Sequence, residues 1–286
     1  MNKKYILLLS VSCFAVLISC LKSFDSQRGN FSTRNVLNYC NAFEFDDSSD
    51  NFFSLSDTII SVMKSYNCEV LIDNETIDSL SVKNIYCRFY PQKAKRLLLC
   101  CNYDKPREDS IFCAAEVAVL LEIARNISDS LSNNDCGVDI AFFDADNVKY
   151  SAATNRYNSN CAGCRLFCKN FVSTLKNKPQ YGIFLYKPAI IGGILEKDNH
   201  SHYFAAHLMK KIWYYGQYLG YDKYFSENII KPVNNLGSVL SKEADIRTLT
   251  ISCHNKSQSK ETVKNLDTVL IKATGDVILQ AIFRLY

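Results

Sequence analysis

Side chains that can bind metal ions or transfer protons stand at the ends of several apolar runs. Asp104, Asp144, Asp146 and His254 each lie at or just after a run that is typical of a buried β-strand. Carboxylates and imidazoles are zinc ligands and general bases in enzymes. In sheets of parallel strands, ligands bind outside the carboxyl ends of the strands. We therefore expect any functional site to lie at this edge of the predicted sheet.

Other residues at the same predicted edge are poorly suited to metal chemistry. The run at 96–103 ends on Asn102 and Tyr103, and the run at 181–186 ends on Tyr186. Zinc in proteins is held by cysteine, histidine and carboxylate side chains rather than by carboxamides. The edge thus combines some reactive residue types with others that a metal enzyme would not use there.

The elements that would position these residues alternate between strand and helix. The runs at 96–103, 137–144, 181–186 and 246–251 are largely apolar, as strands buried on both faces are. Two earlier strands, at 68–73 and 82–91, are candidates for an antiparallel edge. Amphipathic spacing predicts helices at 51–67, 114–130, 161–176, 201–220 and 266–285. This order predicts a three-layer α/β/α sandwich with a mixed, mostly parallel central sheet.

Several function classes find no support in the sequence. Neither a phosphate-binding glycine loop nor a G-x-S-x-G nucleophile elbow is present. The net charge of +4 is spread over interspersed lysines and acids, so no basic patch for nucleic acid is expected. The chain shows no internal break, and we expect a single domain over 36–286.

The N-terminus has the layout of an export signal. Lys3 and Lys4 precede an apolar run, 5–17, that is short for a transmembrane span. The run ends in Leu-Ile-Ser-Cys, which resembles the lipobox of bacterial lipoproteins. This predicts a signal peptide at 1–19, a lipid on Cys20 that anchors the chain to a membrane, and a polar tether at 20–35. An ordinary signal peptide or an uncleaved anchor is the alternative. The predicted location is the bacterial cell envelope, periplasmic or surface-exposed.

Cysteine is abundant, with thirteen residues. Because Cys13 lies in the signal and Cys20 would carry lipid, eleven remain, and an odd number cannot all pair within the chain. Cys161, Cys164 and Cys168 form the tightest group. Their spacing fits a metal or redox site. It also places all three on one face of a helix, where cysteine acts as a small apolar residue and two of the three could form a disulfide. We favour the helix-face interpretation, because no second C-x-x-C completes a zinc site.

A family resemblance emerges from the framework residues. The segments SYNCEV, NIYCRFYPQKAKRLLLCCNYD, VAVLLEIARN, GVDIAFFDADN, YGIFLY and GQYLGYDKYF resemble, in order and spacing, zinc-dependent exopeptidases of the aminopeptidase and glutaminyl-cyclase superfamily. Bacterial glutaminyl-peptide cyclotransferase-like members are the nearest likeness. The resemblance covers residues 36–286 and implies the fold and a zinc site.

The resemblance fails at the positions that would hold zinc. By that resemblance, Asn102 replaces a histidine ligand, Phe112 and Tyr186 replace aspartates, and Asn147 replaces a carboxylate ligand. Asp146 stands at the position of the catalytic base, one methylene short of glutamate.

A few polar residues of the implied cleft survive in kind. They are Asp104, which corresponds to a supporting aspartate, together with Asp144, Asn234 and His254.

The sequence therefore predicts an exopeptidase-like lipoprotein that is catalytically inactive and has no cofactor. Zinc needs at least three protein ligands and an open position for water, and replacing most of them removes the activated water. Its expected partners are the membrane, through Cys20, and a peptide or protein ligand. The alternative is a zinc-dependent aminopeptidase or glutaminyl-peptide cyclotransferase with relocated ligands, drawn from Asp104, Asp146, His254 and a cysteine.

Overall fold

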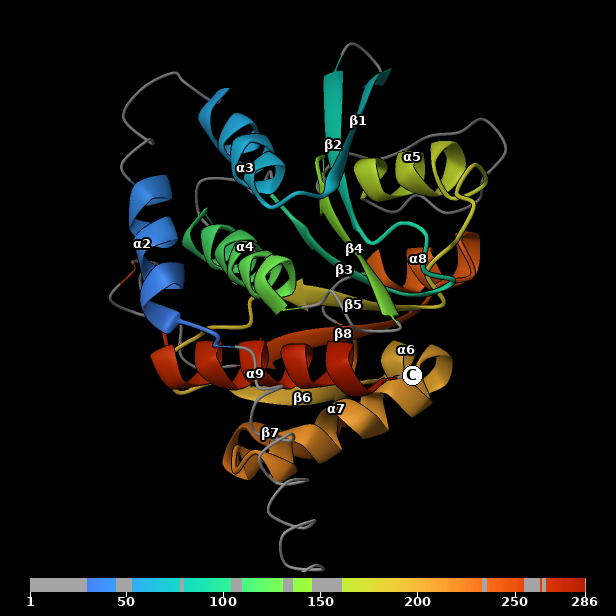
Figure 1. The fold of residues 1–286 in the computed structure, drawn as a ribbon. Coiled ribbons are helices and arrows are strands. Elements are labelled where there is room, and N and C mark those ends of the chain that lie inside the picture. Colours follow the sequence, from blue (N-terminus) through green and yellow to red (C-terminus); the bar gives the residue numbers. More distant parts are fainter. Residues whose placement is uncertain are drawn as a thin grey trace, which may run out of the picture.

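An eight-stranded sheet forms the centre of the molecule, in the order β1-β2-β4-β3-β5-β8-β6-β7 (Figure 1). The computed structural model describes residues 30–44, 53–77, 80–103, 110–130, 136–145, 161–232, 236–254, 263 and 266–285. The strands span Glu69–Ile77 (β1), Leu80–Phe89 (β2), Lys95–Asn102 (β3), Cys136–Phe143 (β4), Tyr181–Tyr186 (β5), Ile194–Asp198 (β6), Phe225–Ile230 (β7) and Arg247–His254 (β8).

The middle of the sheet is parallel and its flanks are mixed. Strands β4, β3, β5 and β8 run parallel to one another. The hairpin β1–β2 joins β4 in antiparallel pairing, and β6 is antiparallel to β8 while parallel to β7. All of β4 and nearly all of β3 are buried, which explains their largely apolar sequence. The predicted mixed, mostly parallel sheet with an antiparallel edge is confirmed.

Helices cover both faces of the sheet. They span Thr33–Glu44 (α2), Phe53–Ser65 (α3), Ser110–Ser130 (α4), Ala162–Asn170 (α5), Asn199–Phe204 (α6), Ala206–Tyr218 (α7), Leu236–Glu243 (α8) and Thr268–Arg284 (α9), with a 3-10 turn at Asp222–Tyr224. Helices α4 and α9 lie on one face together with α2, α3 and α7, and α5 and α8 lie on the other (Figure 1). The three-layer α/β/α architecture is therefore also confirmed.

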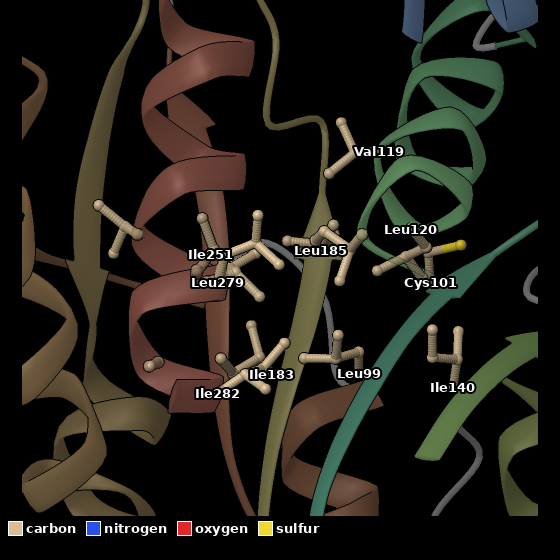
Figure 2. Packing of buried hydrophobic residues seen from close by; sticks show 14 of the residues in the cluster. Leu99, Cys101, Val119, Leu120, Ile140, Ile183, Leu185, Ile251, Leu279 and Ile282 are labelled. Carbon is tan, nitrogen blue, oxygen red and sulfur yellow. The ribbon is translucent and has the colours of Figure 1, made fainter. Parts of the chain in front are cut away.

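The main core lies between the parallel strands and helices α4 and α9. Leu99, Ile183 and Ile251 come from three neighbouring strands and point toward Leu120 of α4 and Leu279 of α9 (Figure 2). Burial of such aliphatic side chains contributes about 1.5–3 kcal/mol each. This layer fixes the strands whose carboxyl ends form the candidate site.

The structure differs from the sequence-based expectation in several elements. The helix predicted at 201–220 is broken at Ala205 into α6 and α7, and the helix predicted at 161–176 ends at Asn170. Strands β6 and β7 and helices α2 and α8 were not predicted. Helix α2 begins at Thr33, and Phe31 is already buried, so the fold extends into the predicted tether at 20–35. The signal peptide and Cys20 lie outside the described residues.

The three cysteines of the tightest group are free thiols in the structure. Cys161 precedes α5, and Cys164 and Cys168 follow along one side of it. All three pack into the core between the sheet and helices α5 and α8, as the helix-face interpretation predicts. Within the described part of the chain, none of the helices combines the length and hydrophobicity needed to cross a bilayer.

Candidate binding site at the carboxyl ends of the parallel strands

Four side chains from adjacent strands form a row at the carboxyl edge of the sheet. Asn102 of β3 pairs in register with Phe143 of β4, and Tyr186 of β5 pairs with Ser252 of β8. Strand β3 pairs with β5 up to Cys100 and Phe184, so Asn102 and Tyr186 come two residues later on both strands. We call Phe143, Asn102, Tyr186 and Ser252 the strand-end row. It lies on the face that α5 and α8 cover.

Asn102 is the most unusual member of the strand-end row. Its side chain is 1% exposed, and neither Oδ1 nor Nδ2 has a hydrogen-bond partner among the described residues. Its backbone carbonyl, in contrast, accepts a hydrogen bond from the Cys113 thiol at 3.2 Å. A buried polar group without a partner costs about 1–3 kcal/mol, so such groups are rare in native structures and call for an explanation.

Ser252 shows the same pattern two strands away. Its hydroxyl is buried and has no hydrogen-bond partner in the part of the chain that is described. Between Asn102 and Ser252 lies the half-buried ring of Tyr186, and the ammonium of Lys187 sits 5.9 Å from the centre of that ring. The row therefore offers a carboxamide, a hydroxyl and an aromatic ring with a cation beside it.

Glu116 of α4 holds the end of β5 in place. Its side chain is fully buried, and Oε1 accepts a hydrogen bond of 2.8 Å from the backbone N–H of Lys187. Lys187 has a left-handed backbone with φ of 49°, which is uncommon for a residue other than glycine. The carboxylate thus fixes the turn that follows Tyr186. Sequence reasoning missed Glu116, and an acid inside the apolar face AAEVAVLL was the signal that could have found it.

Asp144, a predicted polar residue of the site, is engaged in holding the backbone. Its Oδ2 accepts a hydrogen bond from the Lys83 N–H of β2, and its Oδ1 accepts one from the Ala145 N–H, both at 2.8 Å. Its own N–H donates to the side chain of Asn84 at 3.1 Å. Asp144 therefore joins the end of β4 to the neighbouring strand β2, which is a structural role.

The thiols near the strand-end row are held in their neutral form. Burial raises the pKa of Cys253, the neighbour of Ser252, to about 12, and burial also raises the pKa of Cys100 and Cys164 well above the usual value for a thiol. A thiolate is the form that binds metal or acts as a nucleophile. These cysteines are therefore poor substitutes for the missing ligands.

The side chains of the strand-end row do not fit a zinc ion. Asn102 and Tyr186 stand where the resemblance implies histidine and aspartate, and the Lys187 ammonium adds a positive charge beside them. Among the described residues, no three His, Cys, Asp or Glu side chains are grouped so that they could hold a metal ion. His200, His202 and His207 lie on α6 and α7 and form no such group.

The structure does not describe the side chains of several predicted site residues. Asp104, Asp146, Asn147 and Asn234 lie outside the described residues. For two more, the backbone alone is described: Phe112 lies in the first turn of α4, and His254 is the last residue of β8.

The fold is that of solved zinc-dependent exopeptidases and bacterial glutaminyl cyclases. A zinc-dependent exopeptidase from Parabacteroides distasonis matches with a TM-score of 0.77 and 22% identity, over 90% of this chain and 99% of its own. A glutaminyl cyclase from Porphyromonas gingivalis matches with a TM-score of 0.80 and 20% identity, over the same shares of the two chains. One from Bacteroides thetaiotaomicron, bound to N-acetylhistamine, matches with a TM-score of 0.76 and 18% identity, over 89% and 98%.

At the level of sequence, no protein-family model and no curated protein matches this chain. The structural likeness confirms the resemblance in fold over about nine tenths of the chain.

Proposed function

We propose that this protein uses an exopeptidase-like fold to bind a peptide or another protein without catalysing a reaction. The proposal includes a lipid anchor on Cys20 and a place in the bacterial cell envelope. The relatives in fold include proteins named as exopeptidases and glutaminyl cyclases, so peptide ends are the class of ligand that the fold suggests. Binding would take place at the strand-end row.

The observation that carries the proposal is the buried carboxamide of Asn102. A carboxamide has one acceptor oxygen and two N–H donors, which complement the N–H and C=O of a peptide group. Because Asn102 makes neither kind of bond among the described residues, a peptide that reaches it would gain hydrogen bonds at no cost to existing ones. Ser252 offers a second unpartnered group on the same face of the sheet.

The side chains of the row lack what catalysis by a zinc enzyme requires. Hydrolysis or cyclisation in zinc enzymes depends on a metal that activates water or polarises a carbonyl. Asn102 and Tyr186 supply neither the charge nor the ligand type that holds such a metal. The competing proposal, a zinc-dependent aminopeptidase or glutaminyl-peptide cyclotransferase, would have to use ligands outside the strand-end row.

A single preparation tests both proposals. The purified domain is analysed for bound metal, assayed with aminopeptidase and glutaminyl-peptide substrates, and titrated with a glutaminyl tripeptide amide. We expect saturable binding without turnover, and binding at least about tenfold weaker in Asn102→Leu, equivalent to about 1.4 kcal/mol. Stoichiometric zinc with turnover that Asp146→Ala abolishes would establish the enzyme instead. The absence of both binding and turnover would refute the proposal for this ligand class.

A further inference from the structure

Two thiols meet where the hairpin β1–β2 begins. In that hairpin, Glu69 pairs with Arg88, and Val70 pairs with Cys87. Cys68 precedes Glu69, so it lies on the same face as Val70 and diagonally across from Cys87. Both cysteines pack into the core on the α4 side of the sheet, where Cys87 is buried and Cys68 is half-buried.

The two sulfur atoms interact directly. A hydrogen bond from the Cys87 thiol is the main cause that lowers the pKa of Cys68, and the same contact, together with burial, raises the pKa of Cys87. The Cys68 thiol also lies 3.1 Å from the carbonyl oxygen of Met63, at the end of α3. The pair thus has a half-buried member whose pKa is lowered and a buried member whose pKa is raised.

The backbone at Cys68 lies outside the paired part of the hairpin. Cystine bridges need Cα atoms within about 7 Å, and diagonal neighbours in a sheet lie at or slightly beyond that limit. Cys68 comes before the first paired residue of β1 and directly after Asn67, which has a left-handed backbone with φ of 53°. Because the ladder does not hold Cys68, it can approach Cys87 without breaking a strand pair.

We propose that Cys68 and Cys87 are a redox pair that closes to a cross-strand disulfide on contact with a disulfide oxidant. The Cys68 thiolate attacks one sulfur of the oxidant, and that disulfide breaks to release one thiol. The mixed disulfide on Cys68 is then attacked by Cys87, which loses its proton, and a second thiol leaves. One oxidant disulfide is reduced to two thiols while the two cysteines are oxidised to one cystine.

The most deeply buried thiols of the α5 face are poor competitors for the first step. Cys100 and Cys164 are fully buried, and burial raises their pKa, so their reactive thiolate forms are scarce. Cys168 on α5 is half-buried like Cys68 and contacts the group around Cys164, which makes it the matched comparison. A closed bridge would tie the start of β1, and with it the end of α3, to the inner strand β2.

The test uses the folded domain and oxidised glutathione as the oxidant. After incubation, remaining thiols are alkylated and the peptides are mapped by mass spectrometry with and without reductant. We expect a Cys68–Cys87 cystine in the unmodified domain and a higher Tm, which reductant reverses. In Cys87→Ala, a glutathione adduct should persist on Cys68, because the thiol that would displace it is gone. In Cys168→Ala, the cystine should form as before.

Three outcomes would overturn the proposal. They are a cystine that joins other residues in the unmodified domain, a Cys87→Ala variant that retains native circular dichroism but carries no adduct on Cys68, and Cys68 alkylated in full after exposure to the oxidant. The unmodified domain alone decides the first and third, so the conclusion does not depend on whether a variant folds.

Discussion

The carboxamide of Asn102 is buried, and neither of its polar atoms forms a hydrogen bond with a described residue. Replacing it with leucine keeps the number of side-chain heavy atoms and removes both unpartnered polar atoms. We expect Asn102→Leu to raise the free energy of unfolding by about 1–3 kcal/mol, because the cost of leaving those atoms unbonded disappears. Urea unfolding measures this change. A gain in stability together with a loss of peptide binding is the expected signature of a functional residue.

A buried hydroxyl with partners gives the control for Asn102. Ser201 on α6 is buried, accepts a hydrogen bond from the Thr250 N–H of β8 at 2.8 Å, and donates one to Asp198. Ser201→Ala should therefore lower stability, in the opposite direction to Asn102→Leu. If Asn102→Leu instead lost stability to a similar extent, Asn102 would have partners that matter for folding, and its proposed role would be wrong.

How far the site could be predicted depends on the range of the contacts involved. Asn102 and Tyr186 were predicted at the edge of the sheet, because each ends an apolar run whose strand character is local. Asp144 was predicted as a polar residue of the site, but its structural role depends on a hydrogen bond from the Lys83 N–H of a different strand. Glu116 was missed because its partner, the Lys187 N–H, lies 71 residues further along the chain.

At the scale of elements, Glu122 of α4 attaches the start of the folded chain. Its buried carboxylate accepts hydrogen bonds from the Ser32 N–H at 2.9 Å, the Asn35 side chain at 3.0 Å and the Arg125 guanidinium at 2.7 Å. Burial alone would raise the pKa of Glu122, but these hydrogen bonds outweigh it and lower the pKa below its usual value. The ionised carboxylate therefore joins α2 to α4.

The lowered pKa of Glu122 gives a pH dependence with a definite sign. Its contribution to stability is complete above the unfolded-state pKa of about 4.3 and is lost as the pH falls through the lower folded-state pKa. At neutral pH, Glu122→Gln should lower the free energy of unfolding by about 2–3 kcal/mol, because hydrogen bonds to a charged group are lost. Urea unfolding from pH 7 downward should show this difference shrink below about pH 4.

An exposed ion pair provides the comparison for Glu122. Asp245 lies 3.5 Å from the Lys178 ammonium, and its side chain is 89% exposed. Asp245→Asn should change the free energy of unfolding by less than about 1 kcal/mol at any pH, as exposed ion pairs usually do. A pH-independent difference between Glu122→Gln and the unmodified protein would contradict the assigned ionisation.

The elements that were predicted correctly are those with strong local patterns. Strands β3, β4 and β5 are largely apolar runs, and α4 and α9 have long amphipathic spacing. Strand β7 was missed because half of its side chains are exposed and its sequence lacks an apolar run. The break at Ala205 between α6 and α7 was also missed. The hydroxyl of Ser201 holds α6 to β8, and this contact with a distant strand is not visible in the spacing.

At the scale of the whole molecule, the predicted lipid on Cys20 would place the domain at a membrane surface. The described part of the chain begins at Asn30, with Phe31 already buried, so about ten residues lie between the predicted lipid on Cys20 and the first described residue. A chain of that length keeps the domain within a few nanometres of the bilayer. The strand-end row would then meet peptides or proteins of the cell envelope.

Cys20→Ala tests the anchor without touching the domain. Buried acyl chains contribute about 0.8 kcal/mol per methylene, so two or more chains retain a protein in the membrane fraction. We expect the unmodified protein, expressed with its complete N-terminus, to partition into detergent and to incorporate labelled palmitate. Cys20→Ala should do neither, while Cys13→Ala, in the predicted signal, should behave like the unmodified protein. Detergent partitioning that survives Cys20→Ala without palmitate incorporation would show that the apolar run at 5–17 is itself the anchor.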